Sequence, residues 1–248
     1  TNPSGQIKCG GAPQKIMYLA EHYLRKHGLR DKTEVVGAFA GTVMLGVPEI
    51  NATLQGIVEK RDIHMHFKHD LVAIDADAKT AEFARTGDPD APHVTLGYDF
   101  INAVPPMRAP DVIAGSGLDK ADGPHAGFVD VDAYTLQHLR YPDVWALGDV
   151  AAVPTAKTGA AVRKKAPVLV DQLLSHRAGA RGTKTYDGYS SCPLVTGYGS
   201  LILAEFGYSG DRMETFPFDQ RKERWSMYQL KRHLLPQLYF KGMLKGRA

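Results

Sequence analysis

The order of the predicted elements in the first hundred residues constrains the fold more than any other feature of the sequence. A helix is predicted over residues 13–28, a buried strand over 34–40 and a second helix over 48–59. A strand with one polar face follows over 63–67, and a hairpin is predicted between residues 71 and 83. Strands that alternate with helices in this order are typical of a small α/β domain of the nucleotide-binding type.

The second half of the chain is less regular. A strand is predicted over 94–100, and the proline-rich segment 103–110 indicates a connection between domains. Short strands are predicted over 127–131 and 144–147, followed by a long helix over 158–176. The predicted apolar face of that helix carries Val162, Ala166, Leu169, Val170, Leu173 and Leu174.

Several classes of function are excluded by what the sequence lacks. No run of about 18 apolar residues is present, so a membrane-spanning helix is not expected. The two cysteines form no Cys-x-x-Cys pair, and no Cys/His set has zinc-finger spacing. His64, His66 and His69 have no carboxylate or cysteine at a suitable offset, so we expect no metal site. A nucleic-acid partner is not expected either.

Cys9 lies in a Lys-Cys-Gly-Gly-Ala-Pro segment (8–13) next to the first predicted helix. The unpaired N–H groups and the positive dipole end of a helix stabilise a thiolate and lower the pKa of a nearby thiol. The two glycines allow another group to approach the backbone closely. Cys9 is therefore a candidate reactive thiol, with a buried, inert cysteine as the alternative.

Gly148 and Asp149 follow a predicted strand and precede the long predicted helix. This pattern resembles the second flavin-binding motif of flavoproteins with two dinucleotide-binding domains. The resemblance implies that Asp149 binds a ribityl hydroxyl of FAD and that the helix start at Lys157 and Thr158 faces the flavin pyrimidine ring. A positive helix end stabilises the electron density that builds there on reduction. Because Gly-Asp also marks ordinary turns, that alternative stays open.

Cys192 lies in a segment (186–198) rich in Gly, Tyr and Ser. This segment resembles the sulfide:quinone oxidoreductases, above all the mitochondrial type, and the resemblance extends over residues 8–17, 145–157, 201–206 and 231–233. It implies the C-terminal portion of such an enzyme, within the superfamily of flavoprotein disulfide reductases. The implied fold class is α/β, a Rossmann-like fold with two dinucleotide-binding domains.

The resemblance also implies a chemistry. Cys9 and Cys192 correspond to a redox disulfide beside the flavin; sulfide attacks the cysteine like Cys192 and leaves a persulfide, and the cysteine like Cys9 leaves as a thiolate that attacks the flavin. Electrons then pass through FAD to ubiquinone or a similar quinone. Only a sulfur pair can trap HS⁻ by thiol–disulfide exchange. Lys15 and Lys231 match family lysines near the flavin and the quinone, with ordinary surface lysines as the alternative.

Two departures from the family pattern are visible. No Gly-x-Gly-x-x-Gly loop is present, so we expect the N-terminal FAD-binding segment to be missing and this portion alone to be inactive. Gly37, Gly41 and Gly46 do not have the spacing of a dinucleotide-binding loop, so the central domain is expected to bind no NADH. The predicted domains are 1–30 (end of the FAD domain and cysteine turn), 31–112 (NADH-domain-like), 113–185 (returning FAD domain) and 186–248 (quinone and membrane docking).

The C-terminal tail combines basic with apolar side chains. Between Arg221 and Arg247 there are eight basic residues and one acidic residue, Glu223, whereas the whole chain has a net charge of only +3. Aromatic and aliphatic residues between Trp225 and Leu244 accompany these charges, as in helices that bind the surface of an anionic bilayer. We expect residues 221–248 to dock on a membrane, with core packing as the alternative.

The sequence thus predicts an FAD-dependent enzyme that oxidises sulfide to a protein-bound persulfide and reduces a membrane quinone. Its expected location is peripheral, at the bacterial or mitochondrial inner membrane. One alternative is an NADH:quinone dehydrogenase of the same superfamily, which needs no cysteine pair. The other is a non-catalytic remnant that binds membranes or a partner.

Overall fold

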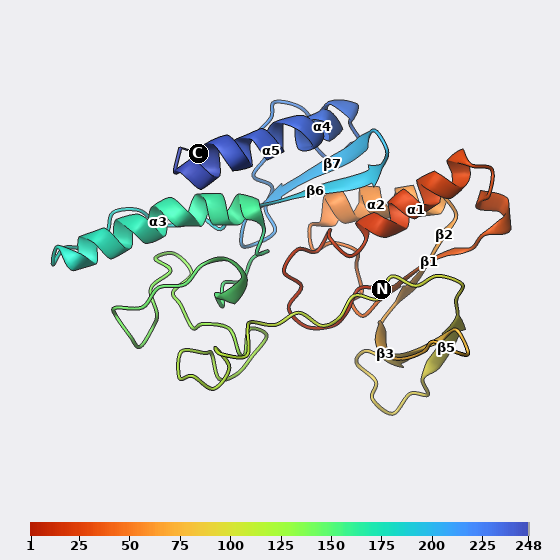
Figure 1. Ribbon diagram of the computed structural model, residues 1–248, viewed down its shortest axis with the longest axis horizontal. Helices are drawn as coiled ribbons and strands as arrows, with labels where there is room; N and C mark the ends of the chain where they lie inside the picture. The colour runs from red at the N-terminus through yellow and green to blue at the C-terminus, as the bar shows by residue number, and fades with distance from the viewer. Residues whose placement is uncertain (248) are drawn as a thin grey trace. The chain divides into compact units, whose positions relative to one another are not determined.

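The computed structural model describes residues 1–247 and divides the chain into two compact units. Unit 1 comprises residues 1–106, 193–203 and 218–229, and unit 2 comprises residues 107–192, 204–217 and the chain from 230 onward. Both units are therefore assembled from segments far apart in the sequence (Figure 1). The four domains expected from the sequence stay a prediction.

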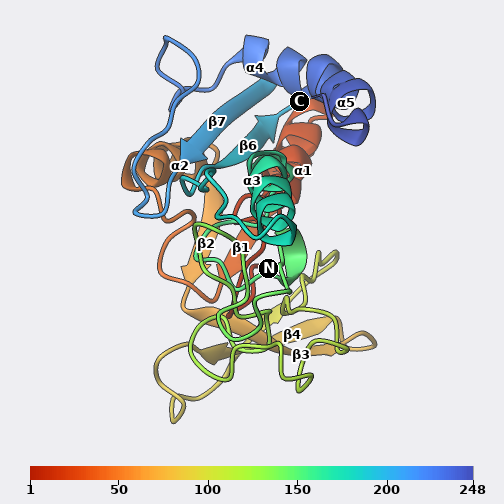
Figure 2. The ribbon, with the colours of Figure 1, turned by 90° about the vertical axis from the view of Figure 1, so that its left-hand side faces the viewer.

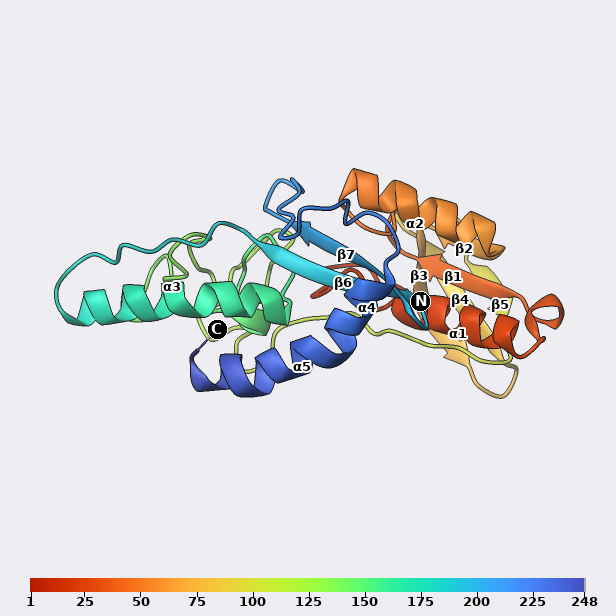
Figure 3. The same cartoon turned by 90° about the horizontal axis from the view of Figure 1, so that it is seen from above.

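Unit 1 contains the α/β arrangement that the sequence predicts. Strands β1 (Val35–Phe39) and β2 (Ile63–Phe67) pair in parallel, and α1 (Lys15–Lys26) and α2 (Pro48–Lys60) lie on opposite sides of the pair (Figures 2 and 3). A short 3₁₀ helix, η1 (Arg30–Lys32), leads into β1. Pro48 fits the first turn of α2 because no helical N–H is needed there.

An antiparallel sheet completes unit 1. It consists of β3 (His69–Asp75), β4 (Thr80–Arg85) and β5 (Val94–Gly97), in that order. The predicted hairpin is confirmed, whereas the strand predicted to reach residue 100 ends at Gly97. Ala81 and Phe83 on β4 pack against Ala38 of β1 in one hydrophobic cluster, which joins the two sheets.

Unit 2 is built around α3 (Gly159–Arg177) and a long irregular segment (Figure 1). The predicted strands 127–131 and 144–147 are wrong, since these segments make only isolated bridges such as that between Val129 and Ala151. Gly127 and Gly148 adopt positive φ angles of 81° and 69°, which turn the chain out of the extended conformation. The 3₁₀ helix η2 (Gly148–Val150) follows at once.

The predicted apolar face of α3 is confirmed only in part: Leu169 packs against the hydrophobic cluster of unit 2, but no residue of that face is fully buried. The buried residues of α3 are Ala161, Lys165 and Val168, whereas Val170 and Leu174 are about half exposed. The hydrophobic cluster of unit 2, which includes Val168 and Tyr186, packs against this other stripe of the helix. A lysine thus occupies a core position that the hydrophobic pattern assigned to solvent.

The hairpin of β6 (Ser190–Gly197) and β7 (Ser200–Phe206) contributes its tip to unit 1 and its base to unit 2. Gly199, with φ of 95°, closes the turn between the strands. The tail that follows comprises α4 (Trp225–Gln229), η3 (Leu230–Leu234), α5 (Leu235–Gln237), η4 (Leu238–Gly242) and η5 (Met243–Lys245). Ala248, the last residue of the expected docking region, lies outside the described residues.

Candidate active site

Cys9 is held in a tight turn in front of α1. It is a half-buried thiol, and its carbonyl oxygen accepts a hydrogen bond of 2.9 Å from the Ala12 N–H. Gly10 leaves no room for a larger residue, because a Cβ at this position would lie 3.0 Å from Leu45 Cδ1. The glycine pair that the sequence singled out therefore allows close packing beside the thiol. Cys9 and Lys15, which is half-buried in the first turn of α1, both belong to unit 1.

Asp149 and the start of α3 lie together in unit 2. A Cβ on Gly148 would lie 3.4 Å from Val162 Cγ2, so this glycine permits the close approach of η2 to α3. Asp149 is exposed. Thr158 is the N-cap of α3, with Oγ1 accepting from the Ala161 N–H at 3.2 Å, and the space beside Gly159 is open. An exposed carboxylate and an open helix N-terminus fit the ribityl and pyrimidine parts of a flavin.

Hydrogen bonds connect the strand that carries Cys192 to the start of α3. Cys192 is a thiol with 1% of its surface exposed. Two residues earlier, Ser190 Oγ lies 3.1 Å from Thr158 Oγ1 and 3.4 Å from the Ala156 carbonyl oxygen. Thr155 Oγ1 also donates to the Gly188 carbonyl at 3.3 Å. Unit 2 therefore brings the Cys192 strand to the capped end of α3, although the two segments are more than thirty residues apart.

The predicted lysines differ in their surroundings. The Lys157 ammonium is buried, donates to the Ala151 carbonyl at 2.7 Å and lies 4.8 Å from the centre of the Phe128 ring. Lys157 thus supports the segment after Asp149 from inside unit 2, and its contact with a cofactor stays a prediction. Lys231 is half-buried in η3 of unit 2. Within residues 1–247 no group of three or more His, Cys, Asp or Glu side chains could hold a metal ion.

The sequence did not reveal the polar groups in the core of unit 2. Lys165 is 1% exposed, its Nζ has no hydrogen-bond partner and it lies 4.9 Å from the centre of the Tyr186 ring. Burial, with a smaller contribution from the charge of Lys157, lowers the pKa of Lys165 to about 8. Glu205 is buried as well and accepts hydrogen bonds from Tyr189 and from Thr215. No periodic or motif signal marks these residues.

Lys165 makes the stability of the protein depend on pH in the alkaline range. Its pKa is about 8 in the folded protein and 10.5 for an ordinary lysine, so the unfolded chain binds more protons between these values. The free energy of unfolding should therefore rise by up to about 3 kcal/mol as the pH rises through this window. Chemical unfolding of Lys165→Met should lack this rise, whereas Lys164→Met, at an exposed neighbour, should keep it. An unchanged pH profile in Lys165→Met would contradict the assignment.

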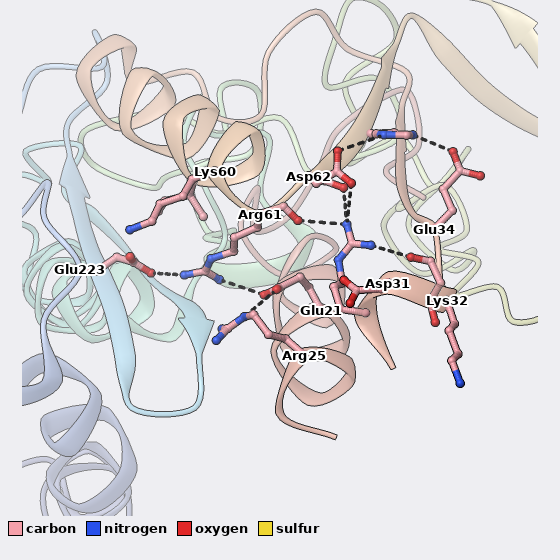
Figure 4. A pocket seen from close by; sticks show the side chains of 13 residues that line it. Glu21, Arg25, Asp31, Lys32, Glu34, Lys60, Arg61, Asp62 and Glu223 are labelled. Carbon is pink, nitrogen blue, oxygen red and sulfur yellow. Dashed lines mark hydrogen bonds and ion pairs between the residues drawn. The ribbon is translucent and has the colours of Figure 1, made fainter. Parts of the chain in front are cut away.

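A charged pocket of about 870 Å³ lies in unit 1, and no predicted site residue lines it (Figure 4). Arg61 is its central group: Nη2 lies 2.7 Å from Glu223 Oε1, and Nη1 lies 3.8 Å from Glu21 Oε2 and donates to the Thr196 carbonyl. Glu21 is 1% exposed and also pairs with Arg25 Nε at 2.9 Å. These ion pairs join α1, the end of α2, β6 and the segment before α4.

Comparison with known proteins identifies relatives along the whole chain. The mitochondrial sulfide:quinone oxidoreductase of Mus musculus is 45% identical over 246 residues, covering 99% of this chain and 54% of that protein. The enzyme of the same name from Dictyostelium discoideum is 44% identical over 247 residues, covering 100% of this chain and 53% of that protein. No protein-family model matches the chain.

The fold has a counterpart among solved structures. The sulfide:quinone oxidoreductase from Aquifex aeolicus superposes with a TM-score of 0.78 and 16% identity, covering 97% of this chain and 57% of that one. The chain spans about half the length of the curated relatives that it matches. By sequence, and along its whole length, the chain is related to the sulfide:quinone oxidoreductases.

Proposed function

We propose that this chain supplies the redox cysteines and the flavin-facing helix of a flavoprotein that oxidises sulfide and reduces a quinone. The observation that carries the proposal is the attachment of the Cys192 strand to the N-terminal cap of α3, beside Gly148 and Asp149. It is supported by the 44–45% identity to proteins named sulfide:quinone oxidoreductase.

The proposed chemistry starts from a disulfide between Cys9 and Cys192. HS⁻ attacks the sulfur of Cys192, the S–S bond breaks, and the products are a Cys192 persulfide, Cys–S–SH, and a Cys9 thiolate that leaves with the electron pair. FAD, when bound, supplies a two-electron acceptor that passes these electrons to a quinone. A nucleophilic sulfur acceptor then removes the outer sulfur from Cys192, which frees its thiolate to form the disulfide again.

The residues of unit 2 suit the flavin end of FAD. The exposed Asp149 carboxylate would accept a hydrogen bond from a ribityl hydroxyl, and the first turn of α3 would place its positive end towards the pyrimidine ring. Lys157 would keep the intervening segment in place through its bond to Ala151. We propose that Lys15 and Lys231 lie near the flavin and the quinone, as the family resemblance implies.

The alternative of an NADH:quinone dehydrogenase finds less support in unit 1. Gly37, on β1, allows two methionine side chains to pack against the strand, because a Cβ at this position would lie 2.7 Å from both Met17 Sδ and Met65 Sδ. The side chains of Met17 and Met65 therefore fill the space beside Gly37. One experiment distinguishes the hypothesis of a non-catalytic remnant from the hypothesis of a sulfide-oxidising enzyme. In the FAD-loaded protein, sulfide added without oxygen should bleach the visible flavin absorbance, and a quinone should restore it; an unbleached flavin would contradict the proposal.

We further propose that the tail binds a membrane surface; because the relatives are named as mitochondrial, we favour the mitochondrial over the bacterial inner membrane. Its large apolar side chains are unusually exposed, as in Trp225 (68%), Phe240 (63%) and Leu244 (61%). Met227 is buried and anchors α4 in unit 1. Among residues 1–247, no helix combines the length and apolar composition that crossing a bilayer requires. Surface docking by these side chains and their basic neighbours needs no such helix.

Replacing Phe240 by serine should weaken binding to anionic vesicles by roughly ten- to a hundredfold, because inserting a phenylalanine contributes about 1.5–3 kcal/mol. Binding should also weaken as salt rises, since each basic residue near an anionic surface contributes about 1 kcal/mol. Phe100→Ser is the matched control, because Phe100 is 77% exposed but lies outside the tail. Vesicle co-sedimentation measures both variants. If Phe240→Ser and Phe100→Ser bind alike, the tail does not dock through its apolar face.

A further inference from the structure

A buried amide connects the Cys9 turn to the rest of unit 1. Gln14 is 1% exposed, and its Nε2 donates two hydrogen bonds of 2.9 Å, to the carbonyl oxygens of Gly10 and Met44. Its Oε1 accepts a bond of 2.8 Å from the hydroxyl of Tyr18, which is fully buried. The phenol thus fixes which way the amide points, so both N–H groups face the two carbonyls.

The loop that contains Met44 and Leu45, to which the Gln14 amide donates, is also held in place. Asn51 on α2 is 8% exposed, and its Oδ1 accepts from the backbone N–H of Met44 at 2.9 Å and of Leu45 at 3.3 Å. Leu45 in turn packs against Gly10, the residue after the cysteine. The Cys9 turn is therefore held on one side by Gln14 and on the other by a loop that Asn51 keeps rigid.

We infer that Gln14 is a positioning residue that fixes the Cys9 turn. The inference rests on the proposed function, in which the Cys9 sulfur must leave a disulfide and return to it in every cycle. A disulfide forms only when its two Cα atoms are roughly 4.4–6.8 Å apart. If the Cys9 turn moves by a few ångströms, the disulfide with Cys192 can no longer form. The two hydrogen bonds that the buried Gln14 amide donates, to the carbonyls of Gly10 and Met44, restrain such motion.

The chain offers a matched control for this role. Gln220 is also 1% exposed and also lies in unit 1, but neither atom of its amide has a hydrogen-bond partner. Gln14→Met and Gln220→Met therefore make the same chemical change at equally buried positions, and only the first removes hydrogen bonds. Tyr18→Phe removes the hydroxyl that orients the Gln14 amide, together with its weaker contact of 3.8 Å to Met44 Sδ, and leaves both bonds donated by Gln14 Nε2 in place.

The test measures first the reactivity of Cys9 and then turnover, in the FAD-loaded full-length enzyme that contains this chain. After reduction of the disulfide, alkylation of Cys9 by iodoacetamide is followed by mass spectrometry across pH, together with hydrogen exchange at the Ala12 amide. Gln14→Met should raise both rates at least tenfold, Tyr18→Phe should raise them less, and Gln220→Met should stay within twofold of the parent. The kcat of sulfide-driven quinone reduction should fall at least tenfold in Gln14→Met, with an unchanged KM for the quinone.

The outcomes separate this inference from the proposed function. Equal Cys9 alkylation in Gln14→Met and Gln220→Met overturns the positioning role, whatever the turnover. If Gln14→Met does not fold, Tyr18→Phe decides, and Cys9 alkylation at the parental rate in that variant overturns the role. Full turnover in Cys9→Ser would instead overturn the proposed function, and the alkylation rates would still decide whether Gln14 holds the turn.

Discussion

In the full-length enzyme, replacing either Cys9 or Cys192 by serine is expected to lower sulfide-driven quinone reduction by at least about a thousandfold, as the loss of a catalytic nucleophile does in other enzymes. A serine hydroxyl forms no disulfide, so HS⁻ finds no S–S bond to attack. Each variant should still bind FAD, because the proposed contacts come from Asp149 and the start of α3 and not from the thiols. Anaerobic stopped-flow absorbance should then show a flavin that sulfide fails to bleach.

Val195→Ala is the control for disturbance of the strand. Val195 lies on β6 close to Cys192 and is nearly as buried, but it has no sulfur. Its truncation should cost some stability and leave the bleaching rate within a few-fold of the parent. Bleaching at near-parental rates in Cys9→Ser or Cys192→Ser would show that the cysteines are not the redox pair.

The elements of unit 1 were predictable because their signals are local. Helical spacing of apolar residues marks α1, Pro48 marks the start of α2, and alternation marks β2. The start of α3 was likewise predictable, since Thr158 is a favoured N-cap residue and does cap the helix. These features depend on neighbours a few residues away, which a single sequence contains.

What the sequence could not reveal depends on distant partners. Strand signals at 127–131 and 144–147 were overridden by glycines with positive φ, and no sheet ladder forms there in the described chain. The buried face of α3 was misassigned because the core of unit 2 accepts Lys165 against Tyr186. The role of Gln14 depends on Met44, a residue thirty positions away, and no periodicity or motif connects the two.

At the candidate site, too, some features were predictable from local motifs and others depend on distant partners. Motifs pointed to Cys9, Cys192 and Asp149, and the structure attaches the Cys192 strand to the cap of α3 through Ser190 and Thr158. The resemblance also pointed to Lys157, whose ammonium turns inward to a carbonyl oxygen. A motif identifies which residue types occur at a site, whereas the direction of a long side chain is decided by the packing around it.

Arg61→Ala should destabilise the protein strongly, with a loss of about 3–5 kcal/mol in the free energy of unfolding. The guanidinium contacts Glu21 and Glu223 (Figure 4) and also the Thr196 carbonyl, and these three residues belong to separate segments of the chain. Without it, the buried Glu21 carboxylate keeps only Arg25, a side chain that is 54% exposed and therefore a weak partner. An uncompensated buried charge costs more than the attraction that is lost.

Urea unfolding of four further variants, which include Glu21→Gln alone as the reference for the double variant, tests this explanation. Lys60→Ala, at an exposed neighbour that lines the same pocket, should change stability by less than about 0.5 kcal/mol. Arg61→Lys should lose an intermediate amount, because an ammonium keeps the charge but cannot contact three acceptors with the fixed geometry of a guanidinium. Adding Glu21→Gln to Arg61→Ala should restore part of the loss, since it removes the stranded charge. If the double variant is as unstable as the sum of the two single changes, Arg61 stabilises unit 1 by packing and not by compensating Glu21.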